Sequence, residues 1–536
     1  MTAVTAPVAL DGRRRDRARP WALTALGVLV AWACWRATSG VDVVNTRGWS
    51  SFAEFWRSIA HPETNIEFLR LTAEAMAVTA AYAVVGTALS VVVGLAGGLV
   101  VAERPWETAG ASGVGRLVRR AARLGARIAF VVPRGVHEVI WALLLIQVLG
   151  FDPLVAVLAI GLQFGAVTAK VYGEILDDTD PAPYRALRAG GARRPAAVAY
   201  GLVPLARPAL VSYGFYRLEC AVRSAAVLGI VGAGGLGFQL DLSFESLRYD
   251  EIWTLVAALM LLSGVADRWS SLVRRSPSAT VVRRSWLALA VAVPVAWWYV
   301  GLDPTSLWSE RTRRLAVDLA AALWPPRLGP GGFDELLSAT VDTLALSVLA
   351  TAIALVGGLA LAVIAARPPR PDAAAGRRLV SWAARTVLLL LRAIPAPIWA
   401  FLVVLVLFPG IWPGAVALGV YNAGVLGRLF AEVIEDHDDR ARRLLDTAGA
   451  SRTGQLLYAV LPSCATRLAN LALYRWEVIT RETVIVGVVG AAGLGRLIQE
   501  HLVARDFAAV LGAVGALIAL TMIIDALSGH LRRAFA

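Results

Sequence analysis

Long apolar runs limit this chain to a small set of folds. Residues 73–102 and 507–527, among others, form almost uninterrupted apolar stretches, and about 20 helical residues suffice to cross the ~30 Å hydrocarbon core of a bilayer. The chain is 57% hydrophobic and 17% charged, with a mean hydropathy of +0.63, which is too apolar for an ordinary soluble enzyme of 536 residues. We therefore predict an all-α, polytopic membrane protein.

Two glycine-rich stretches reveal an internal repeat. Gly229–Gly237 reads GIVGAGGLG, and Gly487–Gly495 reads GVVGAAGLG, 258 positions further on. The same shift relates the following pairs: Arg134 and Arg392, Trp141 and Trp399, Gly161 and Gly419, Glu174 and Glu432, Gly191 and Gly449, Pro204 and Pro462, Glu219 and Glu477, Arg223 and Arg481, and Asp267 and Asp525. A constant shift over so long a stretch indicates a fused tandem duplication.

Each copy of the repeat contains about six candidate membrane helices, which gives about twelve in the whole chain. The first copy places them at 21–36, 73–102, 127–149, 153–172, 204–232 and 251–272. The second copy places them at 286–301, 340–366, 385–408, 412–431, 462–489 and 507–529. These ranges locate the helices without fixing their exact ends.

Basic residues set the expected orientation, because short cytoplasmic loops are enriched in Lys and Arg. Five arginines between residues 13 and 19 place the N-terminus inside. With six crossings per copy, the basic segments 104–127, 274–284 and 367–385 also fall inside. The two copies then share one orientation and form a parallel repeat, with both termini cytoplasmic. We predict a first domain at 1–275, a cytoplasmic basic linker at 276–284 and a second domain at 285–536.

The first glycine-rich stretch contains G-x-G-x-x-G, which is typical of dinucleotide-binding turns when it joins a strand to a helix. Here it follows an apolar helix, and the second copy replaces the middle glycine by Ala492. We interpret the stretches instead as places where helices pack closely or break inside the membrane. The glycines assigned to this role are Gly232, Gly235, Gly237, Gly490, Gly493 and Gly495.

Several chemical sites are not expected on this chain. A Walker A loop needs G-K-[ST], but the only lysine, Lys170, is followed by Val171. Cys34, Cys220 and Cys464 are far apart in apolar surroundings, which argues against a disulfide or a zinc site. The arginine clusters lie at the ends of apolar segments and lack interleaved aromatics, so nucleic-acid binding is not expected. We predict no catalytic residue, metal or cofactor on this chain.

A cytoplasmic segment between the fourth and fifth helices recurs in both copies. Arg185–Pro208 reads RALRAGGARRPAAVAYGLVPLARP, and Arg443–Thr466 reads RLLDTAGASRTGQLLYAVLPSCAT. Each keeps a glycine thirteen residues before a proline, Gly191 with Pro204 and Gly449 with Pro462. This pattern resembles the EAA loop of ABC importer permeases, which implies a short coupling helix that docks on an ATPase subunit. An ordinary arginine-rich interfacial helix is the alternative.

The two loops depart from the family pattern at one position each. Where the pattern usually begins with Glu, this chain has Arg185 and Arg443. Glu174 and Glu432, one helical stretch earlier, are candidates to share the task of that glutamate. The coupling loops then extend over 174–204 and 432–462.

Flanking motifs narrow the resemblance to permeases of the phosphonate type. Each third helix carries Arg-x₆-Trp-Ala, and each fifth helix carries Glu-x₃-Arg ahead of the glycine block. Methionine-type permeases have a similar glycine block without that arginine. The resemblance implies a type I ABC importer architecture with two permease copies fused in one chain. It also implies two copies of an ATPase that uses ATP and Mg, an extracytoplasmic binding protein, and the inner membrane of a bacterium.

Charged residues inside membrane helices are functional candidates because burying a charge in the bilayer is costly. Glu219 and Arg223, like Glu477 and Arg481, have i,i+4 spacing on one helix face. Each glutamate neutralises its arginine in the structural interpretation. In the functional one, the arginines line a shared path and attract an oxyanion, since guanidinium groups suit phosphate-like anions. Arg134 and Arg392 are candidates for a second tier.

Two other classes of protein remain as alternatives to a phosphonate, phosphite or phosphate permease. A twelve-helix secondary transporter driven by an ion gradient has the same helix count, but it does not need the paired glycine–proline loops. A permease for another small solute, such as methionine, also remains open. A membrane enzyme is disfavoured because the histidines are dispersed and form no metal cluster with acidic residues in the sequence. The substrate itself stays open, since selectivity partly belongs to the binding protein.

Overall fold

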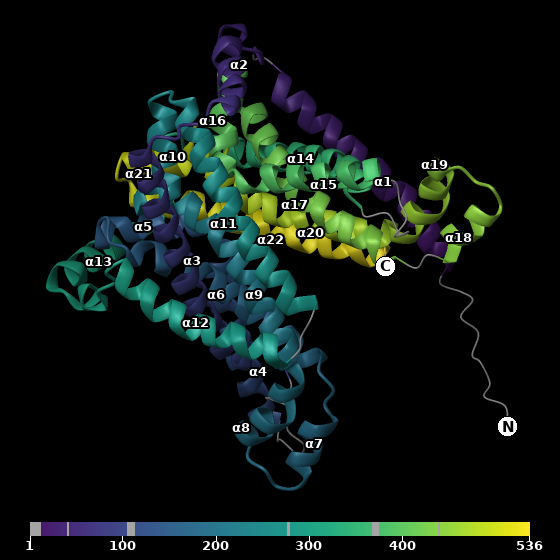
Figure 1. Ribbon diagram of the computed structural model, residues 1–536. Coiled ribbons are helices and arrows are strands. Elements are labelled where there is room, and N and C mark those ends of the chain that lie inside the picture. Colours follow the sequence, from purple (N-terminus) through teal and green to yellow (C-terminus); the bar gives the residue numbers. More distant parts are fainter. Residues whose placement is uncertain are drawn as a thin grey trace. The chain divides into compact units, whose positions relative to one another are not determined.

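The computed structural model describes residues 12–39, 42–103, 113–275, 279–366, 375–437 and 440–535. Within these ranges the chain forms helices and connecting turns, apart from an isolated antiparallel bridge between Val44 and Leu407 (Figure 1). The chain divides into two compact units. Unit 1 comprises Met1–Phe52 and Pro326–Ala536, and unit 2 comprises Ala53–Pro325.

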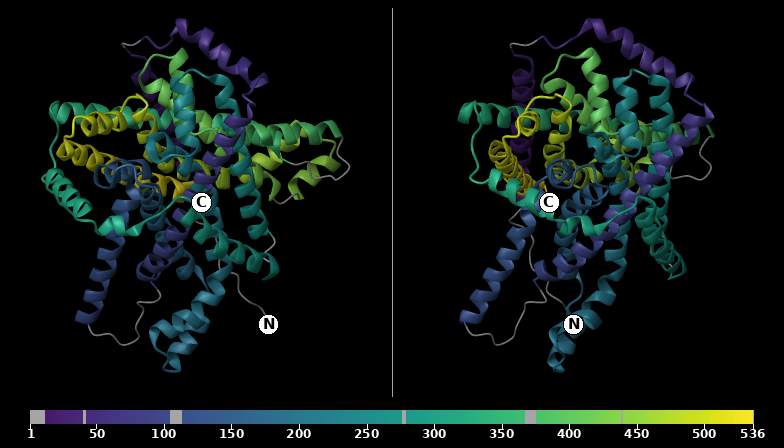
Figure 2. Two further views of the ribbon diagram at one scale, coloured as in Figure 1. Left: turned by 60° about the vertical axis from the view of Figure 1, so that its left-hand side comes forward. Right: turned by 90° about the vertical axis from the view of Figure 1, so that its left-hand side faces the viewer.

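Unit 2 contains the remaining helices of the first copy together with the first helices of the second copy. They are α3 (Ile66–Val101), α4 (Gly113–Gly135), α5 (Glu138–Leu149), α6 (Leu154–Asp178), α7 (Ala182–Ala189), α8 (Arg194–Ala197), α9 (Val203–Leu228), α10 (Leu236–Glu245), α11 (Tyr249–Arg275), α12 (Ala279–Tyr299) and α13 (Glu310–Leu323). The two views of Figure 2 show α4 and the α7–α8 segment extending away from the remainder of this unit.

Unit 1 combines the first helix of the chain with the helices of the second copy. They are α1 (Gly12–Thr38), α14 (Gly332–Ala365), α15 (Ala375–Ala393), α16 (Ala396–Val406), α17 (Ile411–Glu435), α18 (Arg440–Thr447), α19 (Arg452–Gln455), α20 (Leu461–Val488), α21 (Leu494–Val503) and α22 (Phe507–Phe535). The short helix α2 (Trp49–Arg57) contains the boundary between the units.

The predicted membrane helices all coincide with helical segments, which confirms an all-α, polytopic fold. Among the described residues, eight helices are long and apolar enough to cross a membrane, or eleven if each of three bent pairs is one span. The apolar part of α1, Leu26–Thr38, is shorter. Two predicted helices, 127–149 and 385–408, are in fact pairs, because α4 meets α5 at 87° and α15 meets α16 at 91°.

Close glycine contacts hold the long helices of each unit together. In unit 2 a Cβ on Gly98 of α3 would lie 2.8 Å from Cβ of Tyr172 and 3.3 Å from the backbone N of Gly173, both on α6. In unit 1 a Cβ on Gly358 of α14 would lie 3.1 Å from the backbone N of Gly427 on α17. Small residues at such crossings let helix backbones approach, and dispersion contacts then stabilise the pair.

The first helix of each repeat copy packs against helices of the other copy. In unit 1, α1 packs on α14 and α22, and an ion pair of 2.8 Å joins Arg36 to Asp342. In unit 2, α12 packs on α3 and α11, and Trp269 Nε1 donates to Ser285 Oγ at 3.0 Å. Each unit therefore contains chain from both halves of the repeat. The predicted domains at 1–275 and 285–536 follow the sequence repeat and do not coincide with these units.

Parts of the basic segments that set the expected orientation lie outside the described residues. These parts are residues 104–112, 276–278 and 367–374. The remaining residues of the predicted linker, 279–284, belong to the beginning of α12. The cytoplasmic assignment of these segments stays a prediction.

Candidate functional site

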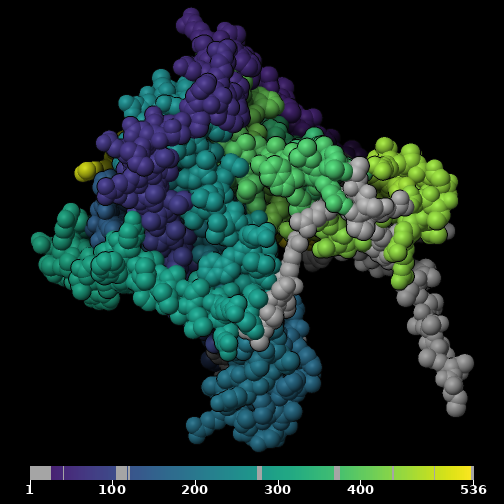
Figure 3. All heavy atoms as spheres, in the orientation of Figure 1, coloured from purple at the N-terminus to yellow at the C-terminus, as the bar shows by residue number. Residues whose placement is uncertain are grey.

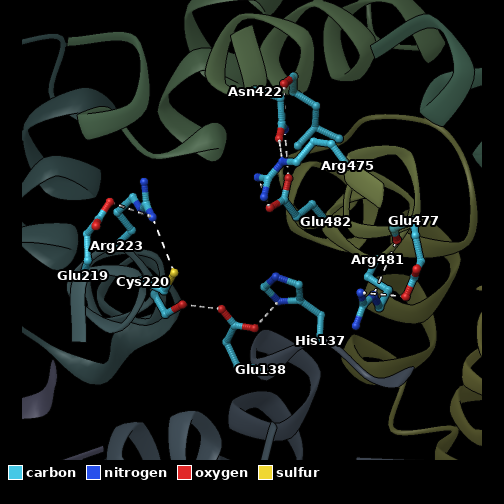
Figure 4. A network of polar contacts seen from close by, with 12 residues as sticks. His137, Glu138, Glu219, Cys220, Arg223, Asn422, Arg475, Glu477, Arg481 and Glu482 are labelled. Carbon is cyan, nitrogen blue, oxygen red and sulfur yellow. Dashed lines mark hydrogen bonds and ion pairs between the residues drawn. The ribbon is translucent and has the colours of Figure 1, made fainter. Parts of the chain in front are cut away.

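The first predicted charge pair forms inside α9. Glu219 Oε1 lies 3.7 Å from Arg223 Nη2, and both side chains are largely buried (Figure 4). Arg223 also approaches Cys220, whose Sγ is 3.6 Å from Nη2. One turn of helix separates the two charged residues, so the helix itself positions the pair.

The second predicted pair forms in the same way inside α20. Glu477 Oε1 lies 3.3 Å from Arg481 Nη2, and about a tenth of each side chain is exposed (Figure 4). Arg481 Nε lies 3.5 Å from the backbone oxygen of Glu477. A buried guanidinium therefore occurs at the same repeat position in both units.

Arg134 and Arg392 lie where the third helix of each copy bends. Arg134 is in the last turn of α4, and Arg392 is in the last turn of α15. Arg392 is buried, and Arg134 is half-buried. The chain then turns sharply into α5 or α16, at His137 in one unit and Pro395 in the other. The two arginines are thus associated with the bends.

A third repeated arginine was missed in the sequence. Arg475 of α20 forms an ion pair of 2.8 Å with Glu482 and donates to Asn422 of α17 (Figure 4). Asn422 also donates to Glu482 at 2.9 Å. Arg217 stands at the equivalent position of α9, where it lies 4.9 Å from the ring centre of Phe164 and donates to the hydroxyl of Tyr213 at 3.0 Å.

Each unit also contains a buried glutamate whose repeat equivalent in the other unit is not acidic. In unit 2, Glu138 of α5 accepts from Ser224 of α9 at 2.6 Å and lies 3.2 Å from His137 Nδ1 (Figure 4). In unit 1, the repeat equivalent of Ser224 is itself the carboxylate Glu482, and the equivalent of Glu138 is Ala396. Glu138 and Glu482 could have been identified from the sequence, because ionisable residues are rare within apolar helices.

The glycine-rich stretch of unit 2 interrupts a helix. After α9 the chain forms a π-helical turn at Gly229–Ala233, and α10 begins at Leu236 with its axis bent by 56°. Gly232 and Gly235 have φ angles of 99° and 78°, a region that L residues with side chains rarely adopt. The backbone N–H of Leu236 donates to Thr79 Oγ1 of α3 at 2.9 Å.

The counterpart in unit 1 has the same construction. Gly490 and Gly493 have φ angles of 95° and 107° between α20 and α21. The backbone N–H of Leu494 donates to Thr343 Oγ1 of α14 at 2.8 Å. In both units the stretch follows a helix, which is not the strand that a dinucleotide-binding turn requires.

Two further glycines of these stretches permit close backbone approach. A Cβ on Gly237 would lie 1.7 Å from the carbonyl oxygen of Ala226, so no side chain fits there. A Cβ on Gly495 would lie 2.8 Å from Cα of Val484. These contacts fold the start of α10 against α9, and the start of α21 against α20.

The two candidate coupling segments each contain a short helix that ends at the predicted glycine. After α7, Gly191 has a φ angle of 86°, and the N–H of Ala192 donates to the carbonyl of Leu187 at 3.0 Å. After α18, Gly449 has a φ angle of 76°, and the N–H of Ala450 donates to the carbonyl of Leu445 at 2.9 Å. Both ends show the Schellman arrangement, in which a left-handed glycine closes the helix.

The prolines and glutamates assigned to these segments lie at helix ends. Pro204 and Pro462 lie in the first turns of α9 and α20, where a missing backbone N–H costs little. Glu174 lies 3.9 Å from Lys170, and Glu432 lies 3.2 Å from Arg428. The Lys170–Glu174 and Arg428–Glu432 pairs occupy equivalent repeat positions near the ends of α6 and α17.

Comparison with known proteins places these features in a family. The chain matches the family described as "Binding-protein-dependent transport system inner membrane component" twice, over residues 107–276 and 358–536. It is 36% identical over 244 residues to the phosphite transport system permease protein PtxC of Stutzerimonas stutzeri, covering 45% of this chain and 86% of that protein.

A second relative spans both halves of the chain. The phosphate-import permease protein PhnE of Mycolicibacterium smegmatis is 28% identical over 417 residues, covering 76% of this chain and 77% of that protein. Among solved structures, the MetNI methionine ABC transporter matches with a TM-score of 0.35 and 19% identity over 38% of this chain and 97% of that chain. The two family matches together extend over more than half of the chain. The chain therefore belongs to the family of binding-protein-dependent transport system inner membrane components, as a multi-pass subunit of an ABC transport complex that carries two permease copies in tandem.

Proposed function

We propose that this chain forms the membrane path of an importer for a phosphorus oxyanion, namely a phosphonate, phosphite or phosphate. The observation that carries the proposal is the buried arginine at the same repeat position of both units, Arg223 and Arg481. The names of the relatives, a phosphate-import and a phosphite permease, support this substrate class. A guanidinium presents paired N–H donors that match the oxygens of such an anion.

In this proposal Glu219 and Glu477 have a supporting role. Each glutamate keeps its arginine oriented and reduces the cost of holding an isolated cation inside the membrane. An arriving oxyanion then competes for part of the guanidinium while the remainder stays bonded to the glutamate. Arg134 and Arg392 provide positive charge at the bends of the third helices.

The energy for transport comes from a separate ATPase. The sequence contains no Walker A loop, so we assign ATP and Mg to two copies of a partner subunit and no cofactor to this chain. An extracytoplasmic binding protein delivers the anion. The complex works in the cytoplasmic membrane of a bacterium, and both termini of this chain face the cytoplasm.

An uptake experiment tests the function. Cells without their own phosphorus transporters receive this chain with the binding protein and ATPase of the same transport system, and uptake of labelled phosphite, phosphonate and phosphate is measured. We expect saturable uptake of at least one of them, unaffected by excess methionine and persisting when a protonophore abolishes the ion gradient. Gradient-driven uptake by this chain alone in liposomes contradicts the proposal and supports a secondary transporter.

A glycine substitution tests the role of the coupling segments. Replacing Gly191 or Gly449 by Val is expected to uncouple ATP hydrolysis from transport, because a β-branched residue in a left-handed conformation costs about 1–2 kcal/mol and displaces the short helix. Asn tolerates this conformation, so Gly191→Asn is the matched control and retains coupling. Substrate-stimulated ATPase activity of the purified complex is the measurement. Parental stimulation in both Val variants rules out a coupling role.

A further inference from the structure

The helix α13 lies between the membrane helices α12 and α14, yet none of its residues is buried. It packs on α5 in unit 2. Its half-buried residues recur at helical spacing and form the side that faces the protein, namely Thr312, Leu315, Leu319 and Leu323. Figure 3 shows the segment 300–325 as a projection at the edge of unit 2.

A second side of α13 is apolar and exposed. Val317 is 59% exposed, and Trp324, directly after the last turn, is 73% exposed. Ala316 and Ala320 are exposed on the same side, since residues three and four positions apart share a helix face. Trp308, just before the helix, is 79% exposed. Two tryptophan rings thus flank an apolar face that no part of the described chain covers.

The charged residues of α13 balance one another. Arg311, Arg314 and Asp318 lie on the remaining side of the helix. Arg313, one turn before the apolar face, forms an ion pair with Glu310, with 2.9 Å between Nη2 and Oε1. The segment contains three arginines and three acidic residues in all. It is therefore amphipathic and carries no net charge.

The preceding helix α12 marks the level of the membrane surface. Only 11% of its most apolar stretch is buried. Its exposed apolar residues form one stripe along the helix, namely Leu287, Val291, Val295 and Trp298. The helix ends in Trp297, Trp298 and Tyr299, and such aromatic residues concentrate where a membrane helix leaves the hydrocarbon. Because α13 begins shortly after this aromatic end, it lies near the membrane surface.

The equivalent segment of the first copy is covered by the protein instead. Phe55 of α2 is fully buried, and its ring centre lies 4.9 Å from that of Trp253 of α11. Trp253 Nε1 donates to the carbonyl of Phe55 at 2.7 Å. The repeat equivalents of these two residues are Arg313 and Leu511. The second copy thus lacks the aromatic pair that attaches the first-copy segment to the helices, and this leaves α13 free for another surface.

We infer that α13 is an interfacial helix, whose apolar face with Trp308 and Trp324 rests on the phospholipid surface at the extracytoplasmic side of the membrane. Tryptophan is favoured at the boundary between acyl chains and headgroups, and an amphipathic helix lies there with its apolar face inward. Because the charges of the segment balance, neutral phospholipid is sufficient. Since α13 packs on α5, it also ties α5 to the membrane surface. This role is independent of the transported anion and goes beyond the proposed function.

Quenching of a fluorescent label on the full-length chain tests this placement. Cys34, Cys220 and Cys464 are replaced by Ala, and a single labelled cysteine is introduced at Ala320, on the apolar face, or at Asp318, on the charged side, as the matched control. The chain is placed in nanodiscs of phosphatidylcholine. We expect lipid with a nitroxide near its headgroup to quench the label of Ala320→Cys about threefold more strongly than that of Asp318→Cys, and aqueous iodide to show the reverse order.

Further variants separate lipid from other partners. Trp308→Ser with Trp324→Ser is expected to abolish the difference between the two labels, whereas Tyr at both positions preserves it. Size-exclusion profiles, and lipid quenching of a Val291→Cys label in α12, verify that each variant is folded and inserted. Iodide quenching of equal strength at Ala320→Cys and Asp318→Cys overturns the inference. So does a difference that arises only with anionic lipid, or only after the extracytoplasmic binding protein is added.

Discussion

Neutralising the charge pairs of both units, by Glu219→Gln with Arg223→Gln and Glu477→Gln with Arg481→Gln, is expected to abolish uptake of the phosphorus oxyanion. The quadruple variant restores local neutrality but removes the positive groups that the anion needs. We expect uptake to fall by roughly two orders of magnitude, the scale of losing a buried charged contact. Uptake of labelled phosphite in cells measures the effect, and the amount of membrane-inserted protein normalises it.

Controls separate this effect from damage to the fold. Single substitutions leave an uncompensated buried charge and destabilise the protein, so a double-mutant cycle isolates the interaction within each pair. The exposed pair Arg496 and Glu500 has the same i,i+4 spacing, and its double Gln variant should transport normally. Wild-type uptake by the quadruple variant leaves the arginines as structural residues.

Adding one methyl group at Gly237 is expected to destabilise the folded protein markedly. The Cβ of Gly237→Ala would lie 1.7 Å from the carbonyl oxygen of Ala226 and 2.8 Å from its carbonyl carbon. The obstruction is backbone, so α9 and α10 must move apart, and overpacking of this kind costs about 1–3 kcal/mol or more. We expect a lower melting temperature in detergent and a smaller monodisperse fraction.

Gly125→Ala is the control for that substitution. Nothing lies within 4 Å of a Cβ at Gly125 in α4, so the same methyl group is accommodated there. Alanine also has the higher helix propensity. An equal melting temperature for the two variants would show that the α9–α10 contact is not tight. The close backbone approach would then not explain why both repeat copies have glycine at this position.

The membrane helices were predictable because hydrophobicity is a local property. The bends between α4 and α5 and between α15 and α16 were not, because the sequence is largely apolar on both sides of each bend. Pro395 precedes α16, but His137 precedes α5, where its Nδ1 accepts from the N–H of Val139. A histidine in the role of a helix cap gives no clear signal in a sequence.

The same distinction applies to the candidate site. The Glu219–Arg223 and Glu477–Arg481 contacts follow from helical spacing alone. The contact of Glu138 with Ser224 joins residues 86 positions apart, and that of Asn422 with Glu482 joins residues 60 apart. Such contacts depend on which helices pack together, which the 258-residue repeat does not specify. The repeat did align Arg217 with Arg475, although only the structure shows their different partners.

The exchanged first helices make the two halves of the chain depend on each other. Taken alone, either half of the chain would lack, within its compact unit, the helix that α1 or α12 provides from the other half. Two separately made halves would need each other, because a lone half would leave part of its core open to lipid. Within one chain, each half is always supplied with the helix that it needs. The two halves nevertheless differ in detail, since the repeat equivalent of Glu138 is Ala396 and that of Glu482 is Ser224.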